Sequence, residues 1–168
     1  DEADAALISD ELDTRYGADY SVIIERSMEA ADKRLHGFED ASDAVALVLA
    51  DRKARGAELL AVARTTHPHA RRGLLVRWGE NRARREEVAQ VLATGMADYF
   101  VVMPMGSPDE RFHRSITEFL EEWWRIRGLP FEMVRVVGAE RSARIHEICD
   151  LLHRHDFPYG LYSSDSEA

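Results

Sequence analysis

The chain has 168 residues, 45% of them hydrophobic and 32% charged, with a formal net charge of −9, which suits one core of domain size and argues against a nucleic-acid partner. It has neither an apolar run near the roughly 18 residues of a membrane span nor the pattern of a signal peptide, so no membrane partner is expected. Its single cysteine, Cys149, cannot form an internal disulfide, which favours a cytoplasmic location.

Helix and strand patterns alternate along the first three quarters of the chain. Helices are indicated by apolar residues at three- and four-residue spacing, and strands by short apolar or β-branched runs between turn residues. Helices are expected over residues 4–15, 28–36, 56–66, 81–94 and 108–127. Strands are expected over residues 20–25, 44–50, 73–78 and 98–102.

Residues 44–50 read AVALVLA, which is apolar on both faces and typical of a parallel strand covered by helices on two sides. With right-handed crossovers, the alternation predicts an α/β fold with an open, doubly wound parallel sheet. Functional residues of such sheets lie at the carboxyl ends of the strands. These ends are Asp51, residues 76–78, and Met103 with Pro104.

The sequence Gly128-Leu129-Pro130 breaks the alternation, and we place a domain boundary there, giving domains 1–128 and 129–168. Beyond it, a strand over 133–138, a helix over 142–155 and a strand over 157–162 form one βαβ unit. Such a unit is too small to be stable alone.

Several of these segments resemble known proteins. The turn Asp1-Glu2 before the first helix, the strand ending at Asp51 and the strand before Met103-Pro104 resemble a response-regulator receiver domain. The phrases that span 11–20, 97–125 and 131–162 are similar to bacterial proteins in which a receiver-like domain precedes a thioredoxin-disulfide-reductase-like flavoprotein.

The resemblance implies a flavodoxin-like receiver fold, followed by a βαβ adaptor that resembles the start of a thioredoxin- or glutaredoxin-like fold. FAD and NADPH sites are then expected downstream in the parent protein, with no cofactor in this segment. Because a receiver's first strand precedes its acidic turn, we expect that strand to be missing, replaced, or exchanged between chains. The chain opens on Asp1 without a methionine, and we expect it to be a piece of a larger protein.

In a receiver, an aspartate takes the phosphoryl group, an acidic pair holds Mg²⁺, and a lysine and a hydroxyl complete the site. The resemblance assigns Asp51 to the phosphoacceptor and Asp1 with Glu2 to the acidic turn. However, Met103 occupies the lysine position before Pro104, and Val76 occupies the hydroxyl position. The loop after Asp51 is also about three residues short. Lys53, Arg52 or Arg77 could supply the missing charge from another direction.

Other residues have simpler interpretations. Arg82, Arg84 and Arg85 lie among Glu80, Glu86 and Glu87 and read as a solvated helix face. Cys149 reads as a buried inert thiol, His113 as a polar-face residue, and His146 with Asp150 as a solvated pair, so no metal site is expected. Trp123 and Trp124 cannot both face one core, so one anchors the helix and the other can cover an interface.

These features favour a non-catalytic regulatory or interaction domain that works on the flavoprotein domain in the same chain, with a homodimer through the long helix as a further expectation. One alternative is an atypical phosphoacceptor that uses Asp51 in two-component signalling. A third is a thiol oxidoreductase that uses Cys149.

Overall fold

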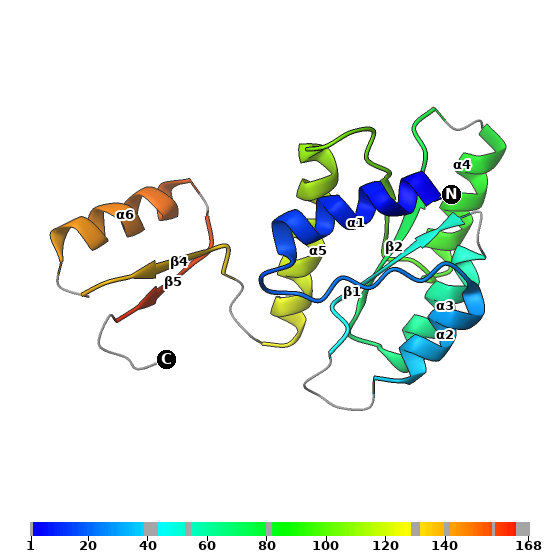
Figure 1. Ribbon diagram of the computed structural model, residues 1–168, viewed down its shortest axis with the longest axis horizontal. Helices are drawn as coiled ribbons and strands as arrows, with labels where there is room; N and C mark the ends of the chain where they lie inside the picture. The colour runs from blue at the N-terminus through cyan, green and yellow to red at the C-terminus, as the bar shows by residue number, and fades with distance from the viewer. Residues whose placement is uncertain are drawn as a thin grey trace. The chain divides into compact units, whose positions relative to one another are not determined.

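The computed structural model describes residues 2–38, 44–52, 55–79, 82–128, 132–139, 142–155 and 157–163, with the backbone alone for 82–84. The chain divides into two compact units, Asp1–Trp123 and Trp124–Ala168. Its fold is mixed α/β, with parallel strands and helices (Figure 1). None of the helices in the described ranges is long and apolar enough to cross a membrane.

The first unit has five helices and three strands among its described residues. In chain order they are α1 Glu2–Tyr16, α2 Met28–His36, β1 Leu47–Asp51, α3 Gly56–Thr66, β2 Arg71–Val76, α4 Arg82–Ala93, β3 Tyr99–Val102 and α5 Glu110–Ile126. The division between the two units falls inside α5, at Trp123.

Local sequence signals explain the starts of two helices. Ser27 caps α2, because its hydroxyl accepts a hydrogen bond of 3.1 Å from the amide of Ala30. α5 begins at Glu110, two residues after the start expected from the sequence. Asp109 caps it, because its carboxylate accepts from the amides of Arg111 and Phe112 at 3.0 and 3.2 Å. A carboxylate suits this position because the first amides of a helix lack partners.

The three strands form a parallel sheet in the order β1-β2-β3. One face packs against α2, α3 and α4 in a core that includes Val48, Leu74, Leu35, Leu60 and Val88. The other face lies under α5, whose buried residues are Phe112, His113, Ile116, Phe119, Leu120 and Trp123. Gly73 of β2 is closely packed: a Cβ there would lie 2.7 Å from a Leu49 methyl and 3.2 Å from a Val101 methyl, so these side chains would have to shift.

The strand expected over residues 20–25 is wrong. Residues 21–26 join α1 to α2 without regular structure, and Ile23 and Ile24 are exposed. An apolar β-branched run becomes a strand only when a neighbouring strand binds its backbone. Among the described residues the sheet ends at β1, so this segment has no strand beside it.

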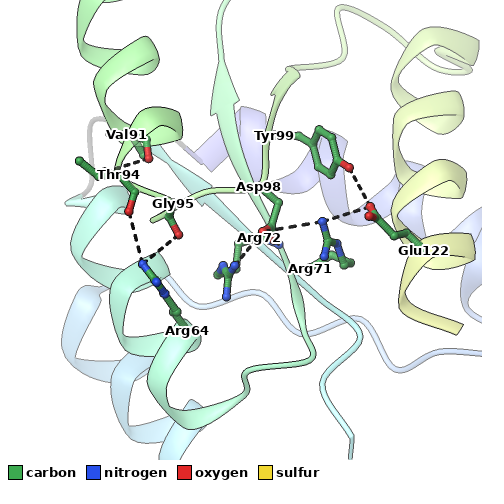
Figure 2. A network of polar contacts seen from close by, with 9 residues as sticks. All are labelled: Arg64, Arg71, Arg72, Val91, Thr94, Gly95, Asp98, Tyr99 and Glu122. Atoms are coloured by element: carbon green, nitrogen blue, oxygen red, sulfur yellow. Dashed lines mark hydrogen bonds and ion pairs between the residues drawn. The ribbon is translucent and has the colours of Figure 1, made fainter. Parts of the chain in front are cut away.

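At the amino ends of the strands, two arginines share the carboxylate of Asp98 (Figure 2). Asp98 accepts from the backbone amide of Arg72 at 2.8 Å and from its guanidinium at 2.7 Å. The Arg71 guanidinium lies 3.0 Å from Glu122 of α5, which also accepts from the Tyr99 hydroxyl at 2.8 Å. This network joins β2, β3 and α5 at the edge opposite to the predicted site.

The second unit contains β4 Val134–Val137, α6 Ala143–Arg154 and β5 Tyr159–Tyr162, with β4 and β5 paired in parallel. Among its described residues, Val136 and Gly160 are the buried ones. The expected boundary after residue 128 lies close to the division at Trp123.

Candidate functional site at the carboxyl ends of the strands

The carboxyl ends of the three strands bring the predicted site residues to one edge of the sheet. Asp51 is the last residue of β1 and is level with Leu75 of β2. The amide of Met103, directly after β3, donates to the carbonyl of Val76 at 2.9 Å. The parallel register therefore brings Asp51, Val76 and Met103 together at the ends of three adjacent strands.

The positions assigned to a lysine and to a hydroxyl are apolar and closed to solvent. The exposed fraction is 7% for Met103 and 9% for Val76, and Pro104 is also buried. A thioether cannot donate a hydrogen bond, and a valine side chain has no polar atom. Neither side chain can stabilise charge on an anion held near Asp51.

Two arginines at this edge face carboxylates of the same chain. Arg77, directly after β2, forms an ion pair with Asp4 of α1, and this guanidinium holds the pKa of Asp4 below its ordinary value. Arg52, directly after β1, lies 2.7 Å from a carboxylate oxygen of Glu87 in α4. Both cations are thus compensated within the chain, which lowers their attraction for an external anion.

Of the expected acidic turn, Glu2 is exposed, and its carboxylate lies 2.8 Å from the guanidinium of Arg26, the last residue of the segment 21–26. Asp1 and Lys53 lie outside the described residues. Asp4, which sequence reasoning did not single out, is the α1 carboxylate that reaches the ends of the strands, through Arg77.

The short loop after Asp51 brings α3 close beneath the strand. Arg55 has a positive φ of 58° and Gly56 begins α3. A Cβ on Gly56 would lie 2.4 Å from the carbonyl oxygen of Asp51. The early glycine in DRKARG is therefore required by this close approach of backbone to backbone.

The loop between β3 and α5 is held by a buried acid that sequence reasoning did not single out as functional. Glu11 of α1 is 2% exposed, and its carboxylate accepts from the amide of Asp109 at 2.8 Å. The same oxygen lies 2.9 Å from Nε2 of His113, which is 4% exposed. The interpretation of His113 as a polar-face residue is therefore wrong.

The signal for this pair was present in the spacing. His113 precedes Ile116 by three residues and Leu120 by seven, which places it on the apolar stripe of α5, and Glu11 follows Ile8 at the same spacing in α1. Deciding that both are buried requires knowing that α1 and α5 face each other.

The remaining candidates lie apart from this edge. Trp123 is buried and contacts the ring of Tyr20, with centroids 6.5 Å apart, whereas Trp124 is half-buried. Cys149 is half-buried, and the interpretation of it as a buried thiol is wrong. None of the residues of α6 is fully buried. The imidazole of His146 contacts the carbonyl of Ser142 at 3.0 Å, one turn earlier.

Comparison with known proteins gives a fold and no family. No model of a protein family matches the chain, and no curated protein matches it. A solved structure described as adenylate cyclase from Rhodopirellula baltica is similar, with a TM-score of 0.54 and 16% sequence identity. The match covers 74% of this chain and 87% of that chain. At this identity the likeness shows the α/β fold alone.

Proposed function

We propose that the first unit is a degenerate receiver-like domain that regulates or assembles a larger protein without accepting phosphate. The observation that carries the proposal is the pair of buried apolar side chains, Met103 and Val76, at the strand ends beside Asp51. A bound phosphoryl group carries roughly two negative charges. A site without a positioned cation loses several kcal/mol of the stabilisation of that charge. The ion pairs of Arg77 and Arg52 with carboxylates support the same conclusion.

The parent protein is proposed to be a bacterial, cytoplasmic flavoprotein similar to thioredoxin-disulfide reductases, with FAD and NADPH bound downstream. The second unit is then a thioredoxin-like βαβ adaptor. Its parallel β4-β5 pair with α6 between them supports this reading. The start of α6 has no cysteine from Ser142 onward to Glu147, so dithiol chemistry is not proposed for it.

The finer fold is proposed to be a doubly wound sheet completed by one strand that leads into α1. The ion pairs of Glu2 with Arg26 and of Asp4 with Arg77 put the start of α1 at the carboxyl edge. Because α1 contacts α5 while α2 packs with α3 on the opposite face, right-handed crossovers would place residues 21–26 beyond β1 and the added strand between them. A chain extended upstream should then show slower amide exchange in β1 and in 21–26 together. Slowing in neither segment would contradict this topology.

The phosphate proposal is tested with beryllofluoride and Mg²⁺, which together mimic a phosphorylated aspartate. Titrated into the 168-residue chain and followed by NMR, they should produce no saturable shifts at Asp51, Val76 or Met103. The control is Asp51→Asn, which removes the acceptor and should behave like the unaltered chain. Saturable binding that Asp51→Asn abolishes would instead favour the alternative, an atypical phosphoacceptor.

A further inference from the structure

The Glu11 site joins three parts of the first unit. Its carboxylate belongs to α1, the Asp109 amide to the β3–α5 loop, and the His113 imidazole to α5. The Ser107 hydroxyl of the same loop also donates to Glu11. Burying a carboxylate is costly unless such hydrogen bonds replace its water, so these contacts decide whether α1 can lie here.

The docking of α1 continues through polar and aromatic contacts along α5. The Tyr16 hydroxyl donates to the His113 carbonyl at 3.0 Å and contacts the Thr117 hydroxyl at the same distance. Further on, Tyr20 contacts Trp123. Residues 11–20 thus follow α5 from its first turn to its last, in the same direction. Ile8 is the one hydrophobic side chain of α1 that is fully buried.

We propose that residues 2–20 form a releasable strap on α5, fixed by Glu11 as its positioning residue. Release of the strap would free the loop 103–109 and uncover α5, the helix within which the chain passes from the first unit to the second. The strap offers a way to change the state of the domain that does not use Asp51. This proposal goes beyond the proposed function, and its test does not depend on whether the domain binds phosphate.

The charges around Glu11 set the expected direction with pH. It faces His113, Ser107 and the Asp109 amide, while Arg15 and Glu110 form an exposed pair nearby, 2.9 Å apart. The Ser107 hydroxyl first, then the Asp109 amide and His113, hold the pKa of Glu11 below its ordinary value of 4.5. A lowered pKa means that the carboxylate stabilises the docked strap fully above that ordinary value. The stabilisation is lost as pH falls through the lowered folded-state value.

Hydrogen–deuterium exchange of the full 168-residue chain tests the strap. Glu11→Gln should speed amide exchange roughly ten- to hundredfold in residues 2–16 and 103–109, while β2 keeps its protection. Glu110→Gln is the matched control, because it removes an exposed carboxylate from the same pair of helices and should change little. Unchanged exchange in Glu11→Gln, or equally faster exchange in β2, would overturn the proposal.

A second arm needs no variant that could misfold. In the unaltered chain, with exchange corrected for intrinsic rates, the protection of α1 relative to β2 should fall as pH drops below 4.5. A ratio that does not change on acidification would overturn the assignment to Glu11.

Discussion

At the scale of single residues, buried ion pairs connect the strands at the amino edge of the sheet (Figure 2). Asp98 faces both Arg71 and Arg72, whose side chains are largely buried. The Arg71 guanidinium also lies 5.5 Å from the centre of the Tyr99 ring. A buried cation that loses its partner is more costly than an exposed ion pair is stabilising.

Asp98→Ala should therefore lower the free energy of unfolding by about 3 kcal/mol, because it leaves the Arg72 guanidinium buried without that carboxylate. Glu118→Gln, which removes an exposed partner of Arg114, should change it by less than about 1 kcal/mol. Chemical denaturation of both variants measures the difference. Equal losses would show that burial does not set the strength of these pairs.

Asp109→Ala should cost about 1 kcal/mol, because the first amides of α5 lose their acceptor, whereas Asp109→Asn should keep most of the cap. The Phe112 amide first, followed by those of Met105 and Arg111, keeps the pKa of Asp109 below its ordinary value of 3.8. Its charge-dependent contribution is thus complete above that value and is lost as pH falls through the folded-state pKa. Denaturation curves at neutral and acidic pH check both points, and a cost in alanine that does not shrink on acidification contradicts the charged cap.

At the scale of elements, the helices could be predicted from sequence because their signals are local. α2 and α3 begin and end where the expected helices do, since capping residues and apolar spacing lie within the segments themselves. The strand predicted over 20–25 is wrong because strand formation depends on a neighbouring strand, which no local pattern reveals. The Glu11–His113 contact could not be predicted for a similar reason, since its two residues lie on different helices.

The turn from β1 to α3 makes a sharp prediction. Gly56→Ala should destabilise the first unit by roughly 1–3 kcal/mol, because the new methyl would meet the backbone carbonyl of Asp51, which cannot swing aside. Gly106→Ala is the control, since nothing lies within 4 Å of a Cβ there. Thermal unfolding compares the two variants, and a Gly56→Ala chain as stable as the control would mean that the approach is looser than described.

At the scale of the whole molecule, the two units differ in how much they bury. The first unit has a core on both faces of its sheet, whereas α6 has no fully buried residue. Because local stability follows buried apolar contact, the two units should open separately. The break at Gly128 indicated a boundary after α5, whereas the division falls inside that helix, at Trp123.

Amide exchange of the intact chain should therefore be faster in α6 and in β4–β5 than in β2 and α3. The expected order reflects local opening of the second unit while the first stays folded. A chain in which Leu152 of α6 and Leu74 of β2 exchange at the same rate would instead unfold as one cooperative body.

The most direct test of the central claim is treatment of the 168-residue chain with acetyl phosphate and Mg²⁺, followed by intact-mass spectrometry. With Met103 and Val76 at the strand ends, the account predicts that the mass stays unchanged under conditions that phosphorylate an active receiver run in parallel. A stable gain of one phosphoryl group that disappears in Asp51→Asn would contradict it.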